Sequence, residues 1–197
     1  MTKTNKVTNG YDMIVIGAST GGPLAVKTVL RELPADFPVG IAYVQHMQAS
    51  FYEQYAQWLN NQLSLSVRLA VNNDYPSPGE VVLAPARFHL VFEDCRLVLD
   101  DSPPIKNLRP SVDKLFVSAA DCFGERLIGI ILTGMGSDGA VGCCEILAHN
   151  GYTIAQDEET SIVYGMPKVA LARNGVTVVL PLEEIGHHLK DLIGISR

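Results

Sequence analysis

A serine in a glycine-lined turn lies near the start of the chain. Ser19 is the central residue of segment 17–21 (GASTG), which follows the apolar residues 13–16 and precedes residues 23–26 (PLAV). This is the G-x-S-x-G pattern, whose small residues allow a sharp strand-to-helix turn that exposes a nucleophilic hydroxyl. Amides of the turn and the N-terminus of the next helix can stabilise an oxyanion. A phosphate-binding turn or a purely structural turn fits the same short motif, so the motif alone predicts no single chemistry.

A base and an acid for such a serine follow two other predicted strands. His46 comes directly after the predicted strand segment 39–45, and Asp138 lies in the glycine-rich segment 133–139. Open parallel sheets bind ligands beyond the carboxyl ends of their strands, so we expect these side chains and Ser19 to meet at one edge. The imidazole would accept the serine proton, and the carboxylate would fix the tautomer of the ring. The simpler alternatives are a partly buried structural histidine and an aspartate that caps the helix following it.

The same glycine-rich segment supports a second interpretation. Residues 134–139 (GMGSDG) match G-x-G-x-x-G, and Asp157 lies roughly where dinucleotide-binding folds place the acid that binds a ribose. However, Asp157 belongs to a hydrophilic loop, and this interpretation leaves the turn at Ser19 unexplained. A dinucleotide-binding domain is therefore the less favoured alternative.

The elements that would position these residues alternate along the chain. Apolar β-branched runs predict strands at 13–16, 39–44, 127–132, 152–155 and 176–179, and the longer segments between or after them predict helices at 23–33, 51–63, 111–123 and 140–149, after Pro167 and from Leu182. Such alternation predicts an α/β fold, doubly wound, with a mostly parallel sheet and helices on both faces. Residues 81–99, interrupted at 93–95, predict an added antiparallel hairpin.

Composition indicates an acidic globular domain. The 197 residues are 47% hydrophobic and carry a formal net charge of −6. A nucleic-acid-binding protein needs a basic stripe that neutralises phosphates, and none is visible. No repeat or low-complexity linker divides the sequence, so we expect a polar tail over residues 1–12 and a single catalytic domain over residues 13–197.

Cysteine usage and hydropathy predict the environment of the protein. Cys95, Cys122, Cys143 and Cys144 form no C-x-x-C pair and have no histidine at zinc-ligand spacing, so we expect reduced thiols and no metal. The N-terminus lacks the apolar core of a signal peptide, and no aliphatic run is long enough to cross a bilayer. These features predict a cytoplasmic protein without membrane insertion.

Taken together, the motifs resemble those of one family, the chemotaxis receptor methylesterases or CheB family, in its catalytic domain. The similarity extends from residue 13 to about residue 189. The matching segments occur in the family's order and are residues 16–22 (IGASTGG), 44–47 (VQHM), 109–113 (RPSVD), 132–140 (LTGMGSDGA), and 156–158 (QDE) through 165–167 (GMP).

The resemblance implies hydrolysis of glutamate γ-methyl esters on the cytoplasmic helices of chemoreceptors, with release of methanol, and often deamidation of receptor glutamines. By motif match Ser19 would be the nucleophile, His46 the base and Asp138 the orienting acid. Thr20 and Met135 match positions with auxiliary roles near the oxyanion. No metal or organic cofactor is implied.

Three residues of the middle segment, Arg87, His89 and Arg109, are candidates for contacts with the substrate. Arg109 stands beside prolines, and an arginine in that position can equally anchor its own loop. We therefore expect a substrate cleft near these residues without a defined role for each.

Two departures from the family pattern bear on regulation and substrate. Only a short polar segment precedes the first strand, so we expect no N-terminal receiver domain in this chain. A separate receiver or kinase partner that regulates the protein in trans is one alternative. Gln48 stands where many members have proline. The substrate could be a chemoreceptor or another methylated protein. A non-catalytic interaction module of a chemosensory complex is the second function class, although the intact Ser19, His46 and Asp138 favour an enzyme.

Overall fold

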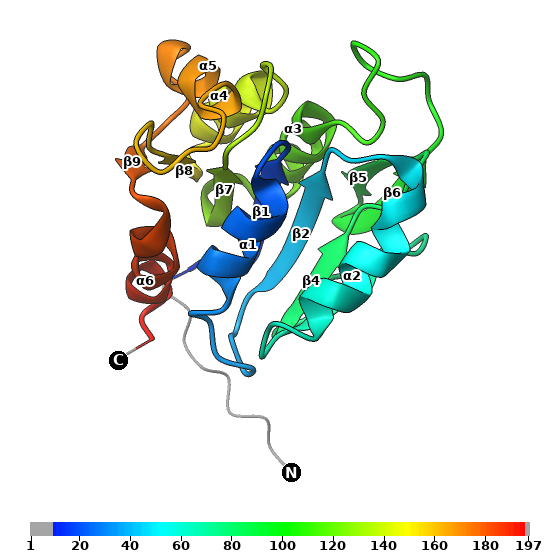
Figure 1. Ribbon diagram of the computed structural model, residues 1–197, viewed down its shortest axis with the longest axis horizontal. Helices are drawn as coiled ribbons and strands as arrows, with labels where there is room; N and C mark the ends of the chain where they lie inside the picture. The colour runs from blue at the N-terminus through cyan, green and yellow to red at the C-terminus, as the bar shows by residue number, and fades with distance from the viewer. Residues whose placement is uncertain (1–9, 196–197) are drawn as a thin grey trace.

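The computed structural model describes residues 10–195 of the chain. Its framework is a parallel sheet of seven strands in the order β3-β4-β2-β1-β7-β8-β9 (Figure 1). The strands are β1 (Met13–Ala18), β2 (Gly40–Gln45), β3 (Ser66–Leu69), β4 (Glu80–Leu83), β7 (Leu127–Ile131), β8 (Tyr152–Gln156) and β9 (Val178–Leu180). The predicted α/β class with a parallel sheet is confirmed. Of the predicted polar tail, residues 1–9 lie outside the described residues.

Helices cover both faces of the sheet, as predicted. They are α1 (Gly22–Leu30), α2 (Tyr52–Asn60), α3 (Val112–Phe123), α4 (Ala140–Ala148), α5 (Met166–Ala172) and α6 (Leu182–Ile193), with short 3₁₀ turns η1 (Ala49–Phe51) and η2 (Gly124–Arg126). The helices α1, α2 and α6 share one hydrophobic cluster, and α3, α4 and α5 share the other. Figure 1 shows α1 and α2 in front of the sheet. Within residues 10–195, no helix is both long enough and apolar enough to span a membrane.

The central strand β1 is buried along its whole length. Ile14 and Ile16 belong to the cluster that contains α1, whereas Met13 and Val15 belong to the cluster that contains α3. Every residue of the neighbouring strands β2 and β7 is also buried. Parallel strands covered on both faces appear in the sequence as continuous apolar runs, which explains why the central strands were predictable.

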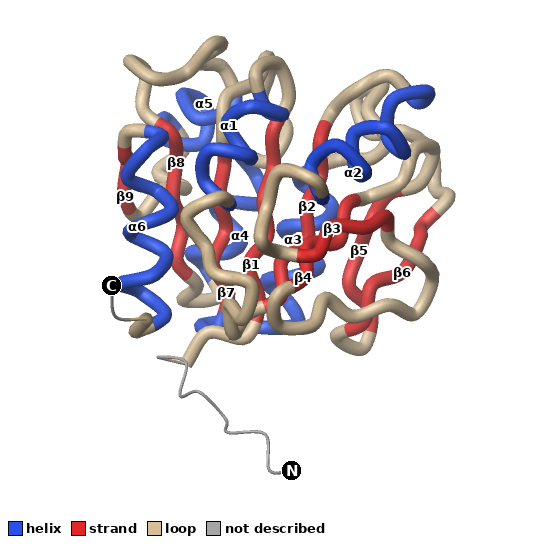
Figure 2. Tube along the Cα trace, turned by 60° about the horizontal axis from the view of Figure 1, so that its bottom comes forward, coloured by secondary structure: helices blue, strands red, loops and turns tan. Residues whose placement is uncertain are grey.

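The antiparallel hairpin is shorter than predicted. It consists of β5 (His89–Glu93) and β6 (Arg96–Asp100), and it lies beside the β3–β4 end of the sheet (Figure 2). The prediction that residues 81–99 form the hairpin is wrong for residues 81–83. These residues belong to β4, which pairs in parallel with β2 and with β3, a strand that the sequence did not predict. An apolar run indicates a strand but does not reveal which distant strand it pairs with.

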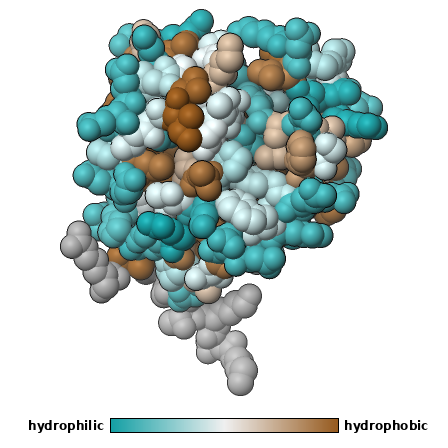
Figure 3. All heavy atoms as spheres, in the orientation of Figure 1, coloured by the Kyte–Doolittle hydropathy of each residue, from teal (hydrophilic) through white to brown (hydrophobic). Residues whose placement is uncertain are grey.

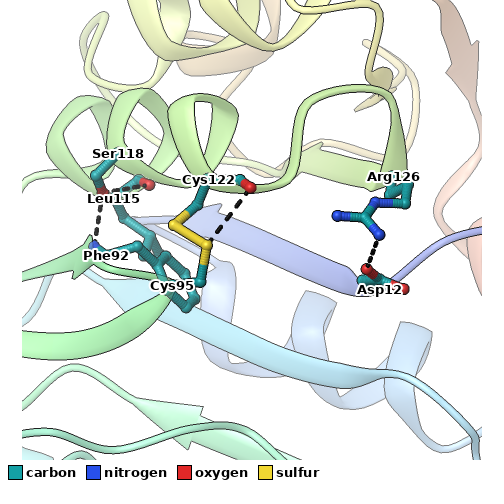
Figure 4. The surroundings of a disulfide bond; sticks show 7 residues. All are labelled: Asp12, Phe92, Cys95, Leu115, Ser118, Cys122 and Arg126. Atoms are coloured by element: carbon teal, nitrogen blue, oxygen red, sulfur yellow. Dashed lines mark hydrogen bonds and ion pairs between the residues drawn. A yellow bond between two sulfur atoms is a disulfide. The ribbon is translucent and has the colours of Figure 1, made fainter.

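A disulfide links the turn of the hairpin to α3 (Figure 4). Cys95, between β5 and β6, is bonded to Cys122 of α3, and their Cα atoms are 5.4 Å apart. Nearby, the Phe92 amide donates a hydrogen bond to Ser118 Oγ of α3 at 2.9 Å. The expectation of reduced thiols is therefore wrong for this pair, whereas the other two cysteines are free. The hairpin brings together cysteines 27 positions apart, a separation that matches no local spacing motif.

The carboxyl ends of β1, β2 and β7 meet at the upper edge of the sheet in Figure 1. Ala18 of β1 pairs with Gln45 of β2, and Gly17 pairs with Ile131 of β7. The chain leaves β1 toward β2 on one side and returns later to β7 on the other side. The strand order therefore reverses at β1, which is where open α/β sheets bind ligands.

Candidate active site

Ser19 lies in the turn between β1 and α1. Its amide donates to the carbonyl of Thr133 at 3.1 Å, which attaches the turn to the loop after β7. Gly134 packs directly against it, because a Cβ atom at Gly134 would lie 2.7 Å from Ser19 Cβ. A larger residue at position 134 would push the two loops apart. The serine is partly exposed, so a bound molecule can reach it.

His46 and Asp138 form a hydrogen-bonded pair at this edge. His46 Nε2 lies 2.8 Å from Asp138 Oδ2, and the two side chains are 9% and 5% exposed. His46 directly follows Gln45, the residue of β2 that pairs with Ala18 at the end of β1. The His46 amide donates to the carbonyl of Ala18 at 2.9 Å. The structure thus joins His46 and Asp138 by a hydrogen bond between their side chains. Main-chain hydrogen bonds of Ser19 and of its neighbour Ala18 place Ser19 at the same edge.

Asp138 also caps a helix, but not the one predicted. Its Oδ2 accepts the amide of Val112 at 2.6 Å, and its Oδ1 accepts the amide of Asp113 at 3.0 Å and Ser111 Oγ at 2.8 Å. These groups form the N-terminus of α3. The alternative that Asp138 caps the following helix is wrong, since the carboxylate is bonded to the start of α3 and the residue that directly precedes α4 is Gly139, which has no side chain. A carboxylate from another loop stabilises the unpaired first amides and the positive end of α3.

Asp113, in turn, caps the N-terminus of α4. From the first turn of α3, its Oδ1 accepts the amide of Gly142 at 2.9 Å. Each of the two helices is therefore held by an aspartate that lies at the start of the other. This exchange fixes α3 against α4 and places the amides that bind Asp138.

The environment keeps Asp138 ionised. Burial by itself acts to raise the pKa of the Asp138 carboxyl, but hydrogen bonds from His46, from the amides of Asp113 and Val112 and from Ser111 lower it below its usual range. Burial raises the pKa of the Asp113 carboxyl, and the nearby charge of Asp138 adds to this effect. Asp138 is thus the carboxylate that remains negatively charged beside His46.

The hydrogen bond to Asp138 decides which nitrogen of His46 is free. When Nε2 donates its hydrogen to the carboxylate, Nδ1 carries the lone pair and can accept a proton. A serine hydroxyl, a neutral imidazole and a buried carboxylate at the same strand ends can perform nucleophilic acyl transfer.

The two auxiliary candidates border Ser19. Thr20 follows the serine, is exposed, and accepts a hydrogen bond from Thr133 Oγ1 through its carbonyl at 2.9 Å. Met135 follows Gly134 and is 77% exposed. Both therefore lie at the edge of the site, where their side chains can meet a substrate.

The three substrate-contact candidates differ in placement. His89 is completely buried, with Nδ1 accepting the amide of Ser111 at 3.1 Å and Nε2 lying 3.2 Å from the carbonyl of Pro103. Burial lowers the pKa of its imidazole. His89 therefore supports the start of α3, and this placement does not fit the expected contact with substrate.

Arg87 and Arg109 line one pocket of about 220 Å³ together with Met47 and Tyr52, which lie close to His46 in the chain. Arg109 donates from Nη1 to the carbonyls of Asp101 and Ser102, at 2.8 and 3.1 Å, as expected of a loop anchor. Within residues 10–195, neither guanidinium forms an ion pair with a carboxylate of the chain.

Sequence reasoning did not find Gln45. This residue is buried at the end of β2, and its amide contacts the main chain at both Ser19 and His46. The available signal was a polar residue at the end of an otherwise apolar, fully buried strand. Neither the Ser111 hydroxyl nor the α3 amides that hold Asp138 were predicted, because these contacts join distant parts of the chain.

The contacts of Asp157 do not favour the dinucleotide-binding alternative. Its Oδ1 accepts the amide and hydroxyl of Thr160 at 3.0 and 2.5 Å, so the carboxylate stabilises its own loop. Gly134 is required by the close approach of Ser19. In the part of the chain that the structure describes, no three His, Cys, Asp or Glu side chains cluster as metal ligands would.

The fold and the site define a doubly wound α/β protein with a histidine–aspartate pair and a serine turn at the carboxyl edge of its sheet. The CheB methylesterase family model matches residues 14–189, most of the chain. The chain therefore belongs to the CheB methylesterase family.

Relatives and a solved structure agree with this membership. The chain is 46% identical over 186 residues to the protein-glutamate methylesterase FrzG of Myxococcus xanthus, covering 94% of this chain and 56% of the relative. It is 46% identical over 181 residues to a protein-glutamate methylesterase/protein-glutamine glutaminase of Anaeromyxobacter dehalogenans, covering 92% of this chain and 53% of the relative. The chain thus spans about half the length of these curated relatives.

The solved structure is the CheB methylesterase catalytic domain of Thermotoga maritima. It matches with a TM-score of 0.89 and 37% identity, covering 93% of this chain and 99% of that chain. The predicted family and fold are confirmed by these comparisons.

Proposed function

We propose that the chain is a serine hydrolase that removes methyl groups from glutamate γ-methyl esters of chemoreceptors, using Ser19, His46 and Asp138. The hydrogen bond between His46 Nε2 and Asp138 Oδ2, at the strand end beside Ser19, carries this proposal. Membership of the CheB methylesterase family and the names of the relatives support it.

In the first half of the reaction, Ser19 Oγ attacks the ester carbonyl carbon while His46 Nδ1 accepts the hydroxyl proton. The Asp138 carboxylate stabilises the resulting imidazolium through Nε2. The bond between the carbonyl carbon and the methoxy oxygen then breaks, and methanol leaves with the proton from His46. In the second half, water gives a proton to His46 and its oxygen attacks the carbonyl carbon of the acyl-enzyme. The bond between that carbon and Ser19 Oγ breaks, glutamate is released, and His46 returns its proton to Ser19 Oγ. With ammonia as the leaving group, the same steps convert glutamine to glutamate.

Charge that develops on the carbonyl oxygen needs donors at the turn. Thr20 lies at the N-terminal end of α1, where the helix dipole and free amides favour an anion. We assign auxiliary positions beside this oxyanion to Thr20 and Met135. The chemistry requires no cofactor.

The pocket between Arg87 and Arg109 is assigned to the substrate protein. Two guanidinium groups without carboxylate partners among the described residues favour an acidic segment next to the methyl ester. Replacing both arginines with glutamine is expected to raise KM for a methylated receptor fragment about tenfold, as for the loss of one to two charge-assisted contacts. Arg96→Gln, on β6 outside this pocket, is the control and is expected to keep the wild-type KM.

Methanol release tests the proposed activity. The wild-type chain is expected to release methanol from a methylated receptor fragment, and Ser19→Ala is expected to release none above background. Ser137→Ala, in the loop that carries Asp138, is the matched control and should release methanol at the wild-type rate. An inactive wild-type chain, folded by circular dichroism, would instead support the non-catalytic interaction module.

A further inference from the structure

The side chain of Gln45 lies between the main chains of the proposed nucleophile and base. It is 1% exposed, at the end of β2. Its Nε2 donates to the carbonyl of Ser19 at 2.8 Å and to the carbonyl of His46 at 3.0 Å. One amide group therefore joins the turn after β1 to the turn after β2.

Surrounding tyrosines hold this amide in one orientation. Tyr43 donates its hydroxyl to Gln45 Oε1, and the Tyr43 hydroxyl also lies 3.1 Å from that of Tyr55. Tyr52 donates its hydroxyl to the main-chain carbonyl of Gln45 at 2.7 Å. Burial raises the pKa of Tyr43 well above its usual value, so the phenol stays protonated and remains a donor. With Oε1 facing this donor, Nε2 must face the two carbonyls.

The start of α1 closes over the same side chain. A Cβ atom at Gly22 would lie 2.3 Å from Gln45 Oε1, so only glycine allows the helix to begin so close to the glutamine. The amide of Gly22 donates to the Ser19 carbonyl at 2.9 Å, which gives that oxygen a second donor. The glutamine is thus fixed by its tyrosine partners on one side and by α1 on the other.

We propose that Gln45 is a positioning residue, whose amide holds the main chains of Ser19 and His46 at the separation that the proton transfer between their side chains requires. The inference rests on the proposed hydrolase activity. Ser19 and His46 end different strands, so their relative placement depends on contacts between the two turns. A misplacement of roughly 1 Å between reacting groups lowers rates about 100-fold.

The test compares variants that remove the amide donors with one that removes an unrelated buried hydrogen bond. Gln45→Met keeps the length of the side chain but cannot donate to either carbonyl. Tyr43→Phe keeps the glutamine and removes the hydroxyl that orients it, which covers the case in which Gln45→Met fails to fold. Thr153→Val is the matched control. Thr153 lies on β8, and the substitution removes the hydrogen bond that its buried hydroxyl accepts from the amide of Thr177 at 2.8 Å.

Each variant is assayed for kcat and KM with a methylated receptor fragment, for the rate of Ser19 modification by a fluorophosphonate, and for thermal unfolding. We expect Gln45→Met to lower kcat and the modification rate about 10- to 100-fold with KM within threefold of wild type. Tyr43→Phe should lower both rates about 3- to 10-fold. Thr153→Val should lower the unfolding temperature and keep both rates.

Two results distinguish failure of the inference about Gln45 from failure of the proposed hydrolase activity. If the wild type releases methanol and reacts with the fluorophosphonate, but Gln45→Met and Tyr43→Phe retain both rates within twofold, Gln45 is only structural and the inference is overturned. If the folded wild type neither releases methanol nor reacts at Ser19, the proposed function itself has failed.

Discussion

Asp138 shows how one side chain can serve two purposes at the residue scale. Its Oδ2 lies within hydrogen-bond distance of both His46 Nε2 and the first amide of α3. The amides and Ser111 hold the carboxylate in a fixed position and keep it ionised. In the mechanism that we propose, the charge that orients His46 is therefore in place before the reaction begins. Such prior arrangement of charge is what makes an orienting carboxylate effective.

Asp138→Asn should therefore impair both activity and stability. We expect methanol release to fall on the order of 10⁴-fold, because an amide cannot enforce the same imidazole tautomer. The free energy of unfolding should fall by about 1 to 2 kcal/mol, because α3 loses part of its cap. Steady-state kinetics and urea denaturation measure the two effects. A loss of less than tenfold in rate, with the stability loss present, would leave Asp138 only the capping role.

The lowered pKa of Asp138 also predicts how stability depends on pH. The folded-state pKa lies below the unfolded value, so the unfolded chain binds the proton more tightly. The stabilisation is fully present above the unfolded pKa of about 3.9 and is lost as pH falls through the folded pKa. In acid denaturation followed by circular dichroism, the stability difference between wild type and Asp138→Asn should shrink below about pH 4. A difference that stays constant down to pH 2 would contradict this assignment.

At the element scale, the sequence predicted the central strands, in which every residue is buried. Residues of β1 and β7 are fully buried, so their apolar runs were recognised. By contrast, β3 has only four residues of mixed burial at the edge of the sheet, and the sequence did not reveal it. The assignment of residues 81–83 to the hairpin failed because strand pairing is a long-range property.

Part of the candidate site was also predictable from the sequence. The sequence placed Ser19, His46 and Asp138 at one edge because each follows a recognisable strand, and the end of a parallel strand has a known location in this fold. The reciprocal capping of α3 and α4 and the amide contacts of Gln45 depend on how helices and turns pack in three dimensions. No local spacing of residue types encodes these contacts.

The hairpin and α3 give a prediction about stability. The Cys95–Cys122 disulfide closes a loop with a sequence separation of 27 and holds the hairpin against the helix whose N-terminus binds Asp138. Replacing both cysteines with serine should lower the free energy of unfolding by about 2 to 4 kcal/mol, mainly through the entropy of the unfolded chain. Denaturation with and without dithiothreitol measures it. Equal stability of wild type and double variant under oxidising conditions would contradict the expectation.

At the scale of the whole molecule, the described residues leave the edge around Ser19 open. Large apolar side chains are exposed in its loops and in α1, including Met135 at 77%, Ile162 at 66% and Leu24 at 59%. Figure 3 shows hydrophobic surface over α1 and its neighbouring loops on the face in view. Exposed apolar groups beside the edge that carries the candidate site suit a protein substrate or a regulatory partner.

The 197-residue chain should accordingly hydrolyse methyl esters without a phosphoryl donor. Acetyl phosphate is expected to change the rate of methanol release by less than about twofold. Addition of a receiver or kinase partner that docks at this edge should lower the rate, because it would compete with the substrate. A chain that is inactive until acetyl phosphate is added would contradict this prediction.

Covalent labelling tests most directly whether Ser19 is a nucleophile activated by His46 and Asp138. The folded chain is treated with a fluorophosphonate, and the modified residue is identified by mass spectrometry of its peptides. We expect one adduct on Ser19, formed quickly in the wild type and slowed by several orders of magnitude in His46→Ala and Asp138→Asn. No adduct on Ser19, or one formed equally fast in the two variants, would contradict the proposed triad.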